Sequence, residues 1–234
     1  MAAKRFGMLR GAAKPAQARD EATRRLIELA RVEELATQLD SWTELWHREP
    51  AEEEEATVGF LGLLKRLHLC NFKLWHEEDE ARREDVPDAV IVQHKRAIDR
   101  WNQHRNDTIE QLDEFLLAAL VREGVRVRCD AEQNSETPGS ILDRLSIASL
   151  KIYHMAEQAG RTDVDVQHRQ VCAAKHKVLR EQRQDLLVCF ERLLVELLSG
   201  QKRLKLYKQF KMYNDPTLNP ALYSARKRQG GKAP

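Results

Sequence analysis

Two pairs of carboxylates in this sequence have a spacing that could hold a metal ion. Glu110 and Asp113 are separated by one helical turn, so on a helix they lie on one face. Glu78 and Asp79 could supply further oxygen ligands from a neighbouring helix. Carboxylate oxygens are hard ligands that suit magnesium or manganese. These four residues form a candidate site for Mg²⁺ or Mn²⁺, whose chemistry would be metal-assisted hydrolysis of a phosphoester or pyrophosphate.

The Glu110-x-x-Asp113 pair is similar to the carboxylate arrangement of all-helical nucleotide pyrophosphohydrolases of the MazG type. The match is partial, because Glu77-x-x-Glu80 precedes the pair but points away from the apolar stripe of its own helix. Acidic pairs at this spacing are also frequent on solvated helix faces. A purely structural role for the carboxylates therefore stays open as an alternative.

Other common catalytic patterns are incomplete or missing from the sequence. A di-iron site in a helical bundle requires two Glu-x-x-His motifs, and Glu44-x-x-His47 is the only one, at the end of a predicted helix. The sequence contains no P-loop, no nucleophile elbow and no glycine-rich dinucleotide fingerprint. The common machinery for nucleotide hydrolysis and acyl transfer is therefore excluded.

A second set of polar residues could bind a small anion. Basic side chains suit a phosphate or carboxylate group, and arginine adds bidentate geometry. The basic candidates are Arg105, Arg144, Lys151 and Lys175. The predicted ligand-binding set is Asn102, Arg105, Asn106, Asp143, Arg144 and Lys151, in which the asparagines orient the ligand. The alternative is that the basic residues pair with carboxylates of the protein itself, such as Asp99, Asp113, Asp143 and Asp185.

These polar residues interrupt apolar helical stripes as well as occupying outer faces. The segment 138–160 has apolar residues on two sides, which is typical of a central helix buried nearly all round. Asp143 and His154 share one of those sides. An unpaired buried charge is strongly unfavourable, so such residues must meet one another or a ligand. We therefore predict a polar seam between helices, which is either a ligand site or a hydrogen-bonded network that fixes helix register.

The helical periodicity predicts an all-α protein. The helices are expected to end at or just before Pro50, Pro87, Gly124, Gly160 and Gly200. The predicted helices run from residue 20 to before Pro50, from 52 to about 85, from 89 to 123, from 137 to 160 and from 163 to 199. A short basic C-terminal helix over 201–211 and an irregular segment should follow. Because the joins are short, we expect a single-domain bundle of about five long, mostly antiparallel helices.

Composition and charge restrict the domain organisation and the partners. The basic ends, 1–19 and 224–234, are predicted to be disordered tails that flank a helical domain over 20–223. With 39 basic and 37 acidic residues the net charge is only +2, so nucleic-acid binding is not expected. No apolar run is long enough to span a bilayer, and we expect a cytoplasmic protein. The four cysteines have no CxxC pairing, which favours buried, reduced thiols.

Four segments in order resemble the bacterial family known as domain of unknown function 4254. They are "NFKLWHEEDEARRED", "KRAIDRWNQHRNDTIEQLD", "ETPGSILDRLSIASLKIYHM" and "YKQFKMYNDPTLNPALY", and the resemblance covers about residues 60–223. It implies a bacterial cytoplasmic protein with a genomic context of glycosyltransferases for envelope polysaccharides. His76 lies in the first segment, at the rim of its apolar stripe. The resemblance carries no catalytic roles that could be transferred to these residues.

Three functions follow from these patterns. The leading hypothesis is binding of a small anionic ligand, a nucleotide-sugar or sugar phosphate, in the polar seam, in the context of envelope glycan synthesis. The second is a divalent-metal-dependent hydrolase in which His76 or His154 acts as acid or base. The third is a non-catalytic scaffold that docks a glycosyltransferase or another partner enzyme.

Overall fold

The fold is that of a computed structural model, which describes residues 34–51, 59–209, 215–221 and 224. These residues form five helices and two very short strands. The elements are α2 (Leu35–Arg48), α3 (Phe60–Glu80), α4 (Asp88–Arg122), β1 (Glu132–Gln133), α5 (Pro138–Gly160), α6 (Val166–Leu198) and β2 (Lys202–Arg203). The predicted all-α bundle is confirmed.

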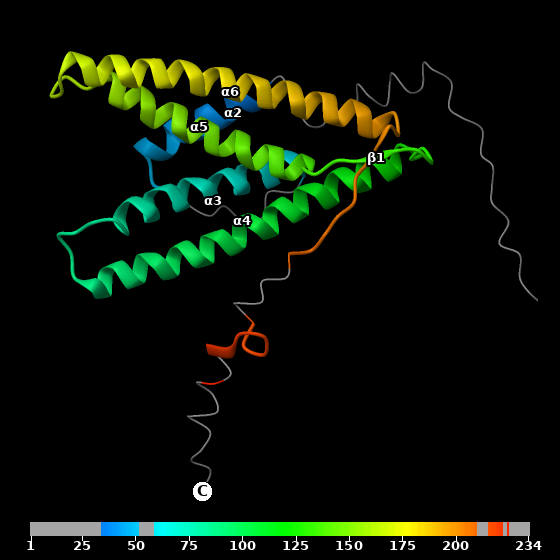
Figure 1. Cartoon of the computed structure of the whole chain (residues 1–234), viewed down its shortest axis with the longest axis horizontal. Coiled ribbons are helices and arrows are strands. Elements are labelled where there is room, and N and C mark those ends of the chain that lie inside the picture. Colours follow the sequence, from blue (N-terminus) through cyan, green and yellow to red (C-terminus); the bar gives the residue numbers. More distant parts are fainter. Residues whose placement is uncertain (1–33, 52–58, 210–214, 222–223, 225–234) are drawn as a thin grey trace, which may run out of the picture.

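The helix α5 is the centre of the bundle. It packs most extensively against α6 and also contacts α2, α3 and α4 (Figure 1). The helices α3 and α4 form a second closely packed pair. Leu142 and Leu145 on α5 are completely buried, and Leu150 is 1% exposed. The predicted central helix is therefore confirmed over 138–152, where only Arg144 and Lys151 are exposed, whereas Ala156, Glu157 and Gly160 near its end are exposed.

Local signals set the helix ends where the sequence indicates them. The side chain of Thr137 caps α5 by accepting a hydrogen bond from the Ser140 amide, and Pro138 occupies the first turn, where it needs no amide donor. After α4 and α6, the backbone turns through Gly124 (φ 66°) and Gly200 (φ 71°). A left-handed φ after the last helical turn is favoured by glycine.

The predicted basic helix over 201–211 does not form in its described part, 201–209. Gly200 ends α6, and its carbonyl accepts a hydrogen bond from the Arg128 amide at 3.0 Å. The next residues form β2, which pairs in parallel with β1. The chain then passes along α4 (Figure 1), where Lys208 pairs with Glu114 at 2.8 Å. Backbone bonds to a distant loop therefore replace the helical bonds that local periodicity predicts.

Several predictions concern segments outside the described residues. These are the two basic tails, most of the first helix before residue 34, and the acidic run 52–55. Within the described helices, none is both long and apolar enough to cross a bilayer. None of the four cysteines forms a disulfide bond; Cys70 and Cys172 are buried, whereas Cys129 and Cys189 are exposed.

Candidate functional site

His68 is fully buried and joins three helices. Thr43 on α2 donates its hydroxyl proton to the Leu39 carbonyl (2.8 Å), so its oxygen accepts the bond from His68 Nε2 (2.8 Å). His68 Nδ1 must then accept the proton of the Ser146 hydroxyl on α5, also at 2.8 Å. Burial lowers the pKa of His68 to about 3. This imidazole is therefore neutral near neutral pH and acts as a structural joint.

The network continues from Ser146 to a buried ion pair. Asn71 on α3 donates to both Ser146 Oγ (3.0 Å) and Asp143 Oδ1 (2.9 Å). Arg105 on α4 donates to the two carboxylate oxygens of Asp143 at 2.8 and 2.5 Å. The bonds to Asp143 raise the pKa of Arg105. Thus Arg105 and Asp143, both predicted to contact a ligand, satisfy one another and fix the register of α3, α4 and α5.

The remaining predicted ligand contacts lie in different surroundings. Arg144 pairs with Glu136 at 2.7 Å, and both side chains are about half exposed. Asn102, together with Arg105, lines a cavity of about 330 Å³ between α3, α4 and α5. Asn106 is half-buried and is not part of that lining. The predicted ligand contacts therefore lie in different places: Arg105 and Asp143 form an ion pair, Arg144 forms an exposed pair, and Asn102 lines a small cavity.

The predicted metal ligands occupy two separate places. Glu78 and Asp79 lie at the end of α3 and line the 330 Å³ cavity, where Glu78 contacts Lys95 of α4 at 3.4 Å. Glu110 lies 15 residues beyond Lys95 on the same helix (110 − 95), which corresponds to roughly 22 Å at about 1.5 Å per residue. Asp113 lies further along, where it accepts the backbone amide of Gly139. The four carboxylates therefore do not surround one ion.

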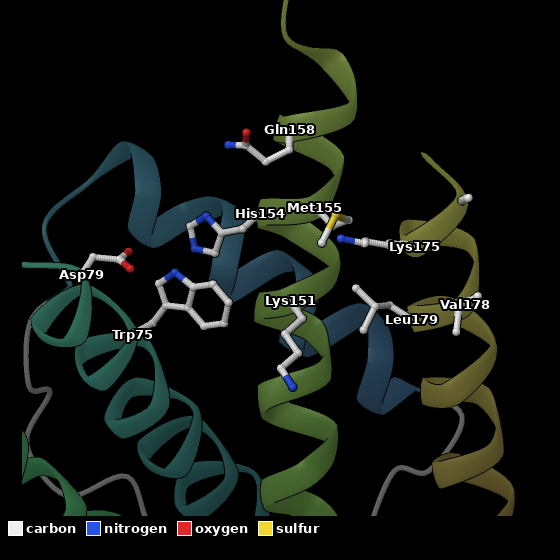
Figure 2. Close-up of a pocket in the computed structure, with 10 residues that line it drawn as sticks. Trp75, Asp79, Lys151, His154, Met155, Gln158, Lys175, Val178 and Leu179 are labelled. Atoms are coloured by element: carbon white, nitrogen blue, oxygen red, sulfur yellow. The ribbon is translucent and has the colours of Figure 1, made fainter. Parts of the chain in front are cut away.

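A larger cavity of about 750 Å³ lies between α3, α5 and α6 (Figure 2). Lys151 lies on α5 between Trp75 of α3 and Leu179 of α6, and Lys175 extends from α6 towards Met155. Its lining residues are Trp75, Asp79, Lys151, His154, Met155, Gln158, Ala174, Lys175, Val178 and Leu179. Trp75 and Asp79 also line the smaller cavity. The two cavities therefore share one wall, at the end of α3.

Three histidines from three helices meet beside this wall. Ring nitrogen atoms of His47 (α2), His76 (α3) and His154 (α5) all lie within 4.8 Å of one another, and each residue is half-buried. Aromatic rings enclose them: Tyr153 stacks on His47 with 4.1 Å between centroids, and Trp75 stacks on His154 with 4.7 Å. Among the described residues this is the one group of at least three histidine, cysteine or carboxylate side chains close enough to share a metal ion.

Comparison with known families agrees with the resemblance seen in the sequence. A family model described as "Protein of unknown function (DUF4254)" matches residues 61–206, which is more than half of the chain. The chain belongs to this family. No curated protein and no solved structure matches it. The DUF4254 region contains all the lining residues of both cavities, together with His76 and His154, whereas His47 precedes it.

The sequence interpretation missed His47, because the residue was considered only as half of a di-iron motif. A usable signal was present, since each histidine of the cluster directly follows a large aromatic residue. The dipeptides are Trp46-His47, Trp75-His76 and Tyr153-His154, the last two within the DUF4254 region. An aromatic neighbour that packs against the bundle keeps the adjacent imidazole close to the interior. The dipeptides are local features, whereas the meeting of the three imidazoles depends on how the three helices pack.

Proposed function

We propose that this protein binds a small anionic ligand, such as a nucleotide-sugar or a sugar phosphate, in the 750 Å³ cavity between α3, α5 and α6. One observation carries the proposal. Lys151 and Lys175, both exposed, line the cavity from two different helices (Figure 2), and neither ammonium group forms a salt bridge with another described side chain. A lysine ammonium is a compact positive charge that suits phosphate oxygens.

The size and chemistry of the cavity support the same conclusion. Its volume lies within the range of about 300–1,000 Å³ that is usual for small-molecule sites. Met155, Val178 and Leu179 supply apolar surface, and Trp75 adds an aromatic edge. Gln158 adds a polar amide to the lining. A ligand with one anionic end and one flat or weakly polar end therefore fits this lining better than a free inorganic anion.

The residues assigned to the anion differ from those that the sequence favours most. Arg105 is held by Asp143 and Arg144 by Glu136, so neither guanidinium is free for a ligand. Lys151 keeps its predicted role, and Lys175 takes the place of the two arginines.

The alternatives receive less support from the geometry. A hydrolase that uses Mg²⁺ or Mn²⁺ at the four predicted carboxylates is disfavoured, because Glu78 of α3 contacts α4 at Lys95, far along that helix from Glu110 and Asp113. A scaffold function predicts that no small molecule binds in the cavity. Titration with phosphorylated compounds therefore distinguishes a scaffold from a ligand-binding protein.

The test is calorimetric titration of the full chain, in the presence of a chelator, with uridine diphosphate glucose and glucose 1-phosphate. Uridine and glucose serve as uncharged controls. We expect the phosphorylated compounds to bind and to raise the melting temperature, because they prefer the folded state. Lys151→Met and Lys175→Met should each weaken binding about tenfold, equivalent to about 1.4 kcal/mol.

The matched control for these variants is Lys177→Met, since Lys177 is an exposed lysine on α6 that does not line the cavity. It should bind as the wild type does. Equal affinities in all three lysine variants would contradict the assignment of the anion contacts. Absence of binding by every phosphorylated probe would overturn the proposal and favour the scaffold.

A further inference from the structure

Two histidines of the cluster each keep one ring nitrogen buried and unbonded. Nδ1 of His47 is hydrogen-bonded to the Thr43 carbonyl at 2.7 Å, and Nδ1 of His154 is bonded to the Glu157 carboxylate at 2.8 Å. The other nitrogen of each ring, Nε2, is buried and has no hydrogen-bond partner in the part of the chain that the structure describes. Buried polar atoms without a partner are rare in proteins and call for an explanation.

The hydrogen bonds determine which nitrogen carries the proton. A carbonyl and a carboxylate can only accept, so His47 and His154 must each donate from Nδ1. In the neutral imidazole, Nε2 then holds a lone pair. His76 of α3 supplies a third ring nitrogen within 4.8 Å of the other two.

We propose that His47, His76 and His154 form a binding site for a transition-metal ion of the zinc type. Imidazole nitrogen suits Zn²⁺ and also Cu²⁺, Ni²⁺ and Fe²⁺. The carbonyl of Thr43 and the carboxylate of Glu157 supply the outer hydrogen bonds that usually orient metal-binding histidines. An ion at this point would satisfy both buried Nε2 lone pairs at once.

The spacing of the ring nitrogens is compatible with an ion after a small adjustment. Tetrahedral zinc binds histidine nitrogen at about 2.0–2.1 Å, which places ligand nitrogens roughly 3.3 Å apart. The three nitrogen atoms lie within 4.8 Å of one another, so none would need to approach another by more than about 1.5 Å.

The donor set indicates the type of site. Three histidine ligands leave one tetrahedral position open, as in catalytic zinc sites, whereas structural zinc sites are closed by four protein ligands. His154 also lines the 750 Å³ cavity, so an ion in the cluster would lie next to the proposed ligand site. The metal proposal does not depend on that ligand, because it rests on the three imidazoles and their hydrogen bonds.

The test is titration of chelator-treated, reduced protein with ZnCl₂ by calorimetry, accompanied by the absorption spectrum of the Co²⁺ form. We expect one ion per chain and a cobalt spectrum without the thiolate charge-transfer band that cysteine ligands produce. His76→Gln and His154→Gln should each weaken zinc binding at least about a hundredfold, since loss of an outer partner alone costs about 10–100-fold. Glu157→Ala, an exposed position, should weaken binding about tenfold.

The matched control is His168→Ala, because His168 contacts the Cys172 thiol at 3.4 Å and forms with it a histidine–cysteine pair, outside the cluster, that could attract zinc. This variant should retain the site. The proposal is overturned if the wild type binds no zinc in a saturable manner, or if a thiolate band dominates the cobalt spectrum. Undiminished affinity in folded His76→Gln would also overturn it. Lys151→Met should leave zinc binding intact, so failure of the metal site and failure of the ligand site can be told apart.

Discussion

Arg105 and Asp143 form a bidentate ion pair between α4 and α5, with Nε–Oδ1 and Nη2–Oδ2 distances of 2.8 and 2.5 Å. The Asp143 side chain is 8% exposed and that of Arg105 is 27% exposed. Asn71 of α3 binds the same carboxylate, so one buried acid connects three helices. The pair is therefore a structural joint of the bundle.

Arg105→Ala should lower the free energy of unfolding by about 3 kcal/mol, because it leaves Asp143 as a buried charge without its partner. This value is at the lower end of the usual range, since Arg105 is partly exposed and solvent weakens the pair. Urea unfolding measures the change. Arg144→Ala is the control: its pair with Glu136 is about half exposed, and its loss should cost about 0–1 kcal/mol. Similar losses in the two variants would show that the Arg105 pair contributes no more than a surface pair.

Stability should fall as the pH is lowered from about 6.5 towards about 3, because His68 has a pKa of about 3 in the folded protein. Between these pH values the unfolded chain binds a proton at His68 that the folded chain does not, so protonation favours unfolding. At about 1.4 kcal/mol per pH unit, His68 should remove about 2 kcal/mol between pH 6.5 and pH 5. Urea unfolding at pH 7 and pH 5 measures this loss.

His68→Gln provides the comparison for the pH effect. Glutamine has no ionisable group, so the variant should be less stable than the wild type at pH 7 but should lose about 2 kcal/mol less on acidification. His76 and the carboxylates titrate in both proteins and cancel in the comparison. Parallel pH profiles for the two proteins would contradict the neutral, buried state of His68.

Gly139→Ala should destabilise the bundle by about 1–3 kcal/mol, because overpacking forces neighbouring groups to move. A Cβ at this position would lie 2.7 Å from the Ile109 carbonyl oxygen and 2.9 Å from the Asp113 carboxylate. Thermal or urea unfolding measures the loss. Gly160→Ala, at the other end of α5, has no atoms within 4 Å of its new Cβ and should be neutral or slightly stabilising. Equal stability of the two variants would argue against the close approach of α4 and α5 at Gly139.

Local patterns predicted the helices well where the determining interactions are local. The Thr137-Pro138 start of α5 and the glycine ends of α4 and α6 depend on capping and on φ, which neighbouring residues control. The segment 201–209 departed from its helical periodicity at its start, because residues 200–203 form backbone bonds with residues 128–133, some 70 positions earlier. Helical periodicity reflects the spacing of neighbouring residues and carries no information about such a distant partner.

For the polar residues too, the sequence predicted one feature, their burial in the bundle, but not the partner of each. Their position within apolar stripes correctly indicated partners inside the bundle for Asp143 and Arg105. The sequence could not show that Arg105 would pair with Asp143 and so be unavailable to a ligand. It also could not show that Lys175 would line the same cavity as Lys151. The partner of each side chain depends on how each helix is rotated about its axis and shifted along it. A shift of one helix by one turn would change every side-chain pair between that helix and its neighbours.

The sequence by itself determined that this chain forms long helices, that α5 is the central one, and that polar groups must be satisfied within the bundle, because these features follow from periodicity, capping and the cost of burying charge. Only the tertiary structure decided that His47, His76 and His154 meet. They come from three helices and are separated by 29 and 78 residues (76 − 47 and 154 − 76). The packing of the side chains between those helices sets their relative rotation, and that packing brings the three imidazoles together.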